Sequence, residues 1–396
     1  MKKRIPELDG LRVIMIFIVS WYHIWQQSWL TPSVGSYSLD WLVRSGYVWV
    51  DGTVLLSSFL LYLPYARAGR KSIPEPAVDF YKRRACRILP SYYFILLLVF
   101  FAVALPFGLY SSPQFMVKDL ATHFTFTFNF WYDSYIGTQL GAACWTLAVE
   151  VQAYLLFPLI VRAIRKKPVL TLSVMALVCF GFRAWVLWSL ADFSIVVNQL
   201  INFLDVYVIG ILSAMAYSAL ERRQEPEKTP WPWRTVASLV FVGCVFALVK
   251  LLRVQAGSGD YFRIQSGQMT RRPLFALCFA GMILSADRSL LPLRFLLGNP
   301  VMKFLAGISM NYYLIHQTLI VHLKRLHFPV SISEQPNMAG ERLWQQQYTL
   351  LSFGLSLILA ILITYLVEKP GAKLLRRLLT PRPVAGSGNT ETAKED

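Results

Sequence analysis

The chain has 396 residues, of which 55% are hydrophobic and 15% are charged, and its formal net charge is +17. Soluble domains carry about a quarter charged residues, and the apolar residues here form blocks near the ~20 residues that cross a bilayer. Composition therefore excludes a soluble domain and predicts an all-α integral membrane protein. The positive charge indicates topology rather than nucleic-acid binding, because Lys and Arg collect in cytoplasmic loops.

About ten transmembrane helices are predicted in chain order. They lie near 11–30, 47–66, 88–107, 145–164, 169–190, 199–220, 235–253, 272–287, 300–323 and 349–367. The first is expected to be permanent, because no small-residue cleavage site follows it. The aromatic- and Thr-rich stretch 108–144 is left open as an interfacial helix, a re-entrant piece or a strand-like lid.

Basic residues alternate from loop to loop. They concentrate at 67–87, 162–167, 221–228, 287–294 and 368–377, whereas the intervening loops are less basic, even with Arg263, Arg271 and Arg272 counted among them. The positive-inside rule then places both termini in the cytoplasm. Residues 1–379 are expected to form one transmembrane domain and 380–396 a disordered cytoplasmic tail, because the tail is polar and contains Pro and Gly. The five cysteines form no CxxC pair and stand at no metal-ligand spacing, so neither a disulfide framework nor a metal site is expected.

The first span carries two groups that lipid penalises, Arg12 and His23. They are eleven residues apart, which places them on one face of a helix about 16 Å apart along its axis. Arg12 could be an interfacial anchor and His23 a satisfied core histidine. Ionisable groups inside a membrane are usually functional, however, and this favours a role for His23.

Further ionisable side chains fall at a similar depth in other predicted spans. Together with His23 they are Asp51, Glu150, Arg183, Asp205 and His316. We expect them to share one buried polar chamber, because each would cost several kcal/mol if isolated in hydrocarbon. A pair such as Arg183 with Asp205 would only hold helices together, whereas histidines suit proton transfer.

The segment FYKRRACRILPSYY (80–93) stands at the opposite membrane face. Arg84 and Arg87 are three residues apart and so share a helix face, with Lys82 and Arg83 beside them. Such a cluster can bind phosphates. On charge alone, positive-inside topology and contact with lipid headgroups are the favoured explanation.

Six motifs in order resemble the membrane-bound acyltransferase family 3, the O-acyltransferases of bacterial cell-surface sugars. The resemblance is carried by IPELDGLR with an Arg and a His separated by ten residues, VDGTVLLSSFLL, FYKRRACRILPSYY, WTLAVEVQAYLLFPL, ISMNYYLIHQTL and YLVEKP. It covers nearly the whole chain apart from the tail. It implies a multi-pass enzyme of the bacterial cytoplasmic (inner) membrane that moves an acyl group, most often acetyl from acetyl-CoA, to a saccharide hydroxyl.

The resemblance also implies roles for the residues identified above. His23 would be the general base, with Glu150 or Asp51 orienting it. The cations Arg12, Arg84, Arg87, Arg83 and Lys82 would bind the donor, while His316, Trp145 and Ser57 would contact the acceptor or shuttle a proton. No metal is expected. The expected partners are membrane lipid, acyl-CoA and a saccharide, with a homodimer left open.

Several alternatives stay open at this point. Direct transfer is preferred to a covalent route through Ser57, Ser58 or His316, because no nucleophile-elbow spacing supports one. A proton-coupled transporter or flippase would also bury charges at one depth, but no inverted repeat is visible. A non-catalytic scaffold would not explain why Arg12 and His23 share a face. The acceptor could also be a cytoplasmic small molecule.

Overall fold

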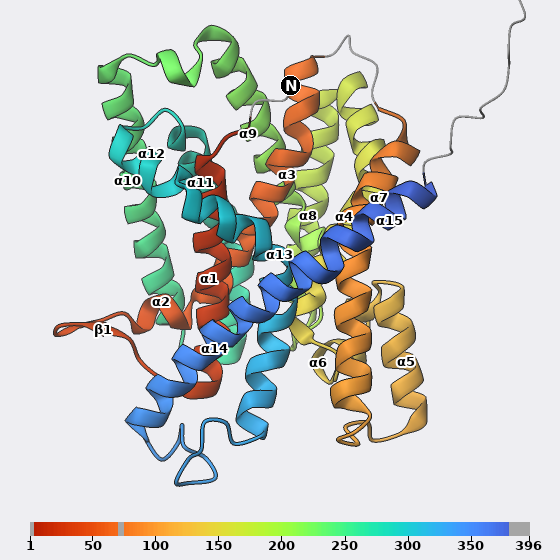
Figure 1. Ribbon diagram of the computed structural model, residues 1–396. Helices are drawn as coiled ribbons and strands as arrows, with labels where there is room; N and C mark the ends of the chain where they lie inside the picture. The colour runs from red at the N-terminus through yellow and green to blue at the C-terminus, as the bar shows by residue number, and fades with distance from the viewer. Residues whose placement is uncertain (1–3, 70–74, 380–396) are drawn as a thin grey trace, which may run out of the picture.

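The computed structural model describes residues 4–69 and 75–379, and this part of the chain is almost entirely helical (Figure 1). The helices are α1 (Glu7–Ser28), α2 (Asp40–Arg44), α3 (Trp49–Ala68), α4 (Ala77–Val99), α5 (Pro113–Phe124), α6 (Tyr132–Ile136), α7 (Trp145–Lys166), α8 (Pro168–Ser189), α9 (Leu204–Arg223), α10 (Trp231–Ala256), α11 (Tyr261–Ala286), α12 (Leu291–Gly298), α13 (Pro300–Arg325), α14 (Arg342–Ile363) and α15 (Lys369–Leu379). Two-residue strands β1 (Ser33–Val34) and β2 (Tyr37–Ser38) pair as an antiparallel hairpin. The predicted tail 380–396 lies outside the described residues.

The predicted fold class is confirmed, since the ten predicted spans all fall on long helices. By length and apolar composition, eight helices of the described chain can cross a membrane. α11 and the segment Leu291–Arg325 are long and apolar enough to cross a membrane only when they are taken together, and they meet at an angle of 107°. Each carries several polar and basic residues, which explains why composition alone does not select them.

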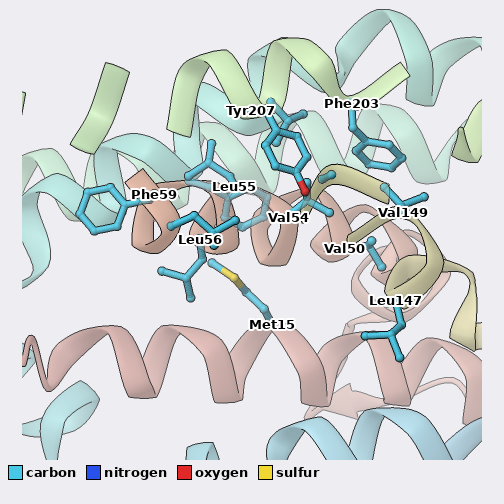
Figure 2. Packing of buried hydrophobic residues seen from close by; sticks show 14 of the residues in the cluster. Met15, Val50, Val54, Leu55, Leu56, Phe59, Leu147, Val149, Phe203 and Tyr207 are labelled. Carbon is cyan, nitrogen blue, oxygen red and sulfur yellow. The ribbon is translucent and has the colours of Figure 1, made fainter. Parts of the chain in front are cut away.

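The bundle is built around α1 and α3. α1 packs against α3, α12 and α13, and α3 packs against α9, so the first helix is enclosed by later parts of the chain. Figure 2 shows Met15 of α1 facing Leu56 of α3, with Phe203 and Tyr207 on the other side of α3. Close packing also requires Gly52 of α3, where an added Cβ would lie 2.9 Å from the ring of Phe279.

Ion pairs bind helix ends together at one end of the bundle, here called the basic end. Arg67 at the end of α3 pairs with Glu221 of α9 at 2.8 Å, and Arg294 of α12 pairs with Glu7 of α1 at 2.8 Å. The basic end is where α1 and α13 begin and where α3, α7 and α9 finish. It gathers the basic segments that the sequence assigns to one side of the membrane.

The stretch 108–144 contains the helices α5 and α6 and no strand, which excludes the strand-like lid among the open alternatives. α5 folds back along α4, because Tyr92 and Tyr93 of α4 donate hydrogen bonds of 2.9 Å to the carbonyl oxygens of His123 and Phe124. Both tyrosines lie four turns into α4, so the hairpin returns to that depth. It is closest to the re-entrant alternative.

The boundary of α11 is the main error in the predicted elements. The span was expected to begin near residue 272, but the helix begins at Tyr261. Arg271 and Arg272, counted as loop charges from the sequence, therefore lie inside a helix, and Arg272 is fully buried. The charges hid the helix start because their partners lie on other helices: Arg272 pairs with Asp51 of α3, and Arg271 donates to the amide oxygen of Gln255 on α10.

α14 and α15 are joined by a π-helical turn at Thr364–Glu368 into one helix of 38 residues, Arg342–Leu379. It crosses the bundle diagonally in Figure 1 and passes α13 on its way to α4. Asn311 of α13 donates hydrogen bonds to Thr364 (2.7 Å) and Glu368 (2.6 Å). These bonds hold the π-helical turn against the middle of α13.

Candidate active site

A cavity of about 140 Å³ lies inside the bundle among α1, α3, α4, α7, α9 and α13. Its polar lining consists of Arg12, Thr53, Ser57, Arg84, Arg87, Thr146, Glu150, Tyr154, Tyr207, Ser309 and Tyr313. Leucines, isoleucines, a valine and a methionine complete the wall. Three arginines against one carboxylate make the cavity positive, so it suits an anionic ligand with an apolar portion.

The arginines of the cavity are not neutralised by carboxylates of their own. Arg84 stacks over the rings of Phe80 (5.3 Å) and Tyr154 (5.1 Å). Within residues 4–69 and 75–379, Arg12 and Arg87 form no side-chain hydrogen bond or ion pair. Their guanidinium donors are therefore available to phosphate oxygens, which they match in geometry.

Glu150 lies in the wall of the cavity and is held by two hydroxyl donors. Ser57 of α3 donates to its Oε1 at 2.6 Å, and Tyr154 donates to the same oxygen. These bonds fix the carboxylate toward α3 and α4. The sequence placed Glu150 beside His23, but the described structure gives the two side chains no direct contact.

The two membrane-embedded histidines face each other across α1 and α13. The ring centroids of His23 and His316 are 5.3 Å apart, so His23 points into the bundle rather than toward lipid. His316 is fully buried, and its Nδ1 lies 2.7 Å from the carbonyl oxygen of Tyr313. That contact places a proton on Nδ1 and leaves Nε2 as an acceptor. Nε2 has no hydrogen-bond partner among the described residues, so a buried acceptor nitrogen is left unused.

Amide side chains set the orientation of His23. Its Nδ1 lies 3.0 Å from Oε1 of Gln26, whose amide nitrogen donates to Tyr22. The amide nitrogen of Gln317 is farther from the same atom, at 3.5 Å. The closer oxygen assigns the proton to Nδ1 of His23, so its Nε2 is also free to accept.

Tyr313 lies between the cavity and the histidine pair. Its side chain lines the cavity, and its ring centroid is 5.4 Å from that of His316. His23 and His316 do not themselves line the cavity. A ligand reaching from the arginines to the imidazoles would therefore have to displace the ring of Tyr313.

The segment before α7 covers the histidines from the end of the bundle away from the basic end. The backbone N–H of Ala143 donates to Oε1 of Gln317, and the side chain of Thr318 lies 3.0 Å from the position of a Cβ on Gly141. Gly141 has φ +120°, a conformation that favours glycine. Gln317 thus lies between this segment and His23.

The expectation of one chamber holding all six ionisable groups is wrong. Asp51 pairs with Arg272 of α11 at 3.1 Å, and Arg183 of α8 pairs with Asp205 of α9 at 2.7 Å, the latter as predicted. The backbone carbonyl oxygen of Asn202 accepts hydrogen bonds from both arginines and joins the pairs. Buried charges need counter-charges nearby, and Asp51 finds its own on α11, so it does not orient His23 here.

The remaining predicted residues lie around this site in different ways. Arg83 is exposed and pairs with Glu75, and neither Arg83 nor Lys82 lines the cavity. Trp145 begins α7 and stacks near Phe203, with ring centroids 5.9 Å apart. Of the predicted donor-binding cluster, the structure brings only Arg84 and Arg87 together with Arg12.

Sequence reasoning missed Gln26, Gln317, Tyr313 and Arg272. Gln26 follows His23 by three residues, a spacing that places it on the same helix face, so this partner could have been found. Gln317 and Tyr313 lie next to His316 in sequence but give no signal of their own. The pairing of Arg272 with Asp51 joins residues 221 positions apart, and only the tertiary structure reveals it.

Comparison with known proteins agrees with this geometry. The family model for an acyltransferase domain matches residues 5–369. O-acetyltransferase OatA of Staphylococcus aureus (strain NCTC 8325 / PS 47) is 26% identical over 336 residues, which cover 80% of this chain and 51% of that protein. Peptidoglycan O-acetyltransferase OatA of Listeria monocytogenes serovar 1/2a is 24% identical over 168 residues, which cover 40% of this chain and 24% of that protein.

The chain therefore spans about half the length of the Staphylococcus relative. No solved structure gives a significant match. The family model covers nearly the whole chain, and this confirms the interpretation as an acyltransferase rather than a transporter or a scaffold. The chain belongs to the acyltransferase family 3.

Proposed function

We propose that the protein is a membrane-embedded O-acetyltransferase that moves an acetyl group from acetyl-CoA to a hydroxyl of a cell-surface or lipid-linked saccharide. The observation that carries this proposal is the order of groups through the bundle. Three arginines line the cavity without an ion pair to any described carboxylate, and two imidazoles, whose Nε2 atoms accept no hydrogen bond from a described residue, lie beyond Tyr313. The relatives named above are O-acetyltransferases, and one of them is named for peptidoglycan.

The cavity has the chemistry that a coenzyme A thioester requires. Its phosphates would lie against Arg84 and Arg87 and approach from the basic end, which the positive-inside rule assigns to the cytoplasm. The pantetheine arm would follow the apolar wall past Arg12 and Ser57. This path runs along α1 for the about 16 Å that separate Arg12 from His23, and its last part requires the ring of Tyr313 to move aside.

The acyl transfer itself needs a base and a path for one proton. Nε2 of His23 takes the proton of the acceptor hydroxyl, and the oxygen attacks the thioester carbonyl. The carbon–oxygen bond forms as the carbon–sulfur bond breaks, and the proton passes from the imidazolium to the departing thiolate. Nε2 of His316 accepts a hydrogen bond from the acceptor and holds it against His23.

The acceptor would enter from the end opposite the basic end, under the segment that holds Gln317. His23 and His316 each lie sixteen residues from where their helix begins, beyond the middle of α1 and of α13. A saccharide that approaches from that side meets the imidazoles before it meets the arginines. A cytoplasmic acceptor would have to share the cavity with the donor.

The test is transfer of radiolabelled acetyl from acetyl-CoA in proteoliposomes, with mass spectrometry of surface glycans from a deletion strain to identify the acceptor. His23→Ala should abolish transfer while the protein still inserts and purifies. Replacing Arg84 and Arg87 with Gln should raise the KM for acetyl-CoA with a smaller change in kcat. Lys166→Gln with Lys167→Gln removes two charges at the same end and serves as control. Full transfer by the His23 variant would refute the assigned base.

A further inference from the structure

A second cavity, of about 360 Å³, opens on the outside of the bundle at its basic end. We call it the α13–α15 groove. It is lined by Arg4, Pro300, Lys303, Phe304, Gly307, Ile308, Thr364, Tyr365 and Lys369. These residues come from the segment before α1, the first turns of α13 and the junction of α14 with α15. Nothing in the proposed acyl transfer uses them.

Three cations surround the groove, and one of them forms an ion pair with a carboxylate. Arg4 pairs with Asp9 at 2.7 Å. Lys303 is exposed, and its side chain forms no hydrogen bond or ion pair within residues 4–69 and 75–379. The ammonium of Lys369 lies 3.6 Å from the ring centroid of Tyr365, a contact that leaves its N–H groups available. The rim is therefore positive and has donors to spare.

The floor of the groove is apolar and open. Phe304 and Tyr365 are exposed, although they lie beside lysines. Gly307 lies between Phe304 and Ile308, and an added Cβ there would meet no atom within 4 Å. An exposed apolar floor beneath a cationic rim is the pattern expected for an amphipathic anion.

The groove is separate from the active-site cavity. Ser309, Met310 and Tyr313 line the cavity from one face of α13, whereas Phe304, Gly307 and Ile308 line the groove from another. The two cavities share no lining residue. A donor molecule held by Arg84 and Arg87 does not pass through the groove.

We propose that the α13–α15 groove binds an anionic phospholipid. The headgroup phosphate accepts hydrogen bonds from Lys303 and Lys369, and an acyl chain runs over Phe304 and Ile308 toward the middle of the bilayer. This inference does not depend on the reaction that the enzyme catalyses.

The helix that follows the groove places it at the level of lipid headgroups. α15 buries no residue, and it combines exposed Leu374 and Leu378 with Lys373, Arg376 and Arg377. A basic amphipathic helix of this kind lies in the membrane interface. Lys369, on the rim of the groove, is the first residue of that helix.

The experiment measures retention of phosphatidylglycerol and of phosphatidylcholine on the purified full chain by native mass spectrometry. The expected result is selective retention of phosphatidylglycerol. Each basic side chain near an anionic headgroup changes affinity about fivefold, so Lys303→Gln with Lys369→Gln should weaken retention about twenty-five-fold. Lys166→Gln with Lys167→Gln, at the same end but outside the groove, should leave it unchanged.

A second variant tests the floor without changing charge. Gly307→Leu places a side chain in open space, and leucine is a better helix former than glycine, so the protein should fold while the groove is filled. Retention should fall in this variant as well. Unchanged retention of phosphatidylglycerol in either groove variant would overturn the proposal. Unchanged retention by Gly307→Leu would mean that the lysines attract the lipid only as general surface charge. Displacement of the lipid by inorganic phosphate or by coenzyme A would also overturn it, by assigning the groove to a free anion or to the donor.

Discussion

Replacing Arg272 by Met should destabilise the protein far more than replacing both Arg272 and Asp51 with uncharged residues. Arg272 and Asp51 have no exposed side-chain surface, and Arg272 also donates to two backbone carbonyl oxygens and lies 4.0 Å from the ring centroid of Phe203. Removing one partner of a buried ion pair leaves an uncompensated charge and costs about 3–5 kcal/mol. Removing both leaves no charge, and the cost should fall to that of the lost hydrogen bonds, about 1 kcal/mol each.

The assay is a double-mutant cycle on Arg272→Met, Asp51→Asn and the double variant, with the free energy of unfolding measured in lipid–detergent micelles. The coupling energy should be at least about 2 kcal/mol, because each single variant leaves the remaining charged side chain buried without its partner. Additive single effects would refute the pairing. Acetyl transfer by the double variant, normalised to the amount of folded protein, distinguishes a structural role of Asp51 from a catalytic one. Near-normal transfer is expected from the structural role, whereas loss of transfer with normal stability would restore Asp51 to the catalytic residues.

Three further predictions concern smaller features. Tyr313→Trp should lower kcat with little change in the KM for acetyl-CoA, because the larger ring obstructs the way from the cavity to the histidines. Single-turnover kinetics measure the acyl-transfer step itself, and an unchanged rate for that step would refute this role of Tyr313. Gln317→Leu should leave folding intact but lower transfer about tenfold or more, as positioning changes near a base do. Gln317→Glu keeps an oxygen that can accept from the backbone N–H of Ala143, so it should recover part of the transfer if that contact positions the site. The backbone N–H groups of Ile332 and Ser333 donate hydrogen bonds to the carboxylate of Glu341 and lower its pKa. These bonds are therefore present above the usual pKa and lost as pH falls through the lowered value. Hydrogen exchange at the two backbone amides should be protected at neutral pH, and Glu341→Gln should reduce this protection unless the bonds play no part in ordering the loop.

Part of the fold and of the site could be predicted from the sequence because the signals are local. Long apolar runs predict helices wherever a bilayer excludes water from the backbone, and the basic segments predict which helix ends lie together. The spacing of Arg12 and His23 fixes a shared face on α1 by helical geometry alone. The motif FYKRRACRILPSYY places Arg84 and Arg87 on one face for the same reason.

The tertiary structure decided which buried groups meet. Six ionisable side chains of similar depth were expected to gather, but depth gives no information on the angle at which each helix faces its neighbours. The structure pairs His23 with His316, gives Glu150 to Ser57 and Tyr154, and gives Asp51 to Arg272.

The physical reason lies in the packing of the helices. A helix presents side chains every 100°, so the partner of a buried charge depends on which helix lies opposite, and that is a property of the whole bundle. The sequence by itself determined the membrane architecture, the basic end and the first-helix pair. The packing of α3 between α1, α9 and α11 determined which charges are structural and which basic nitrogens stay free.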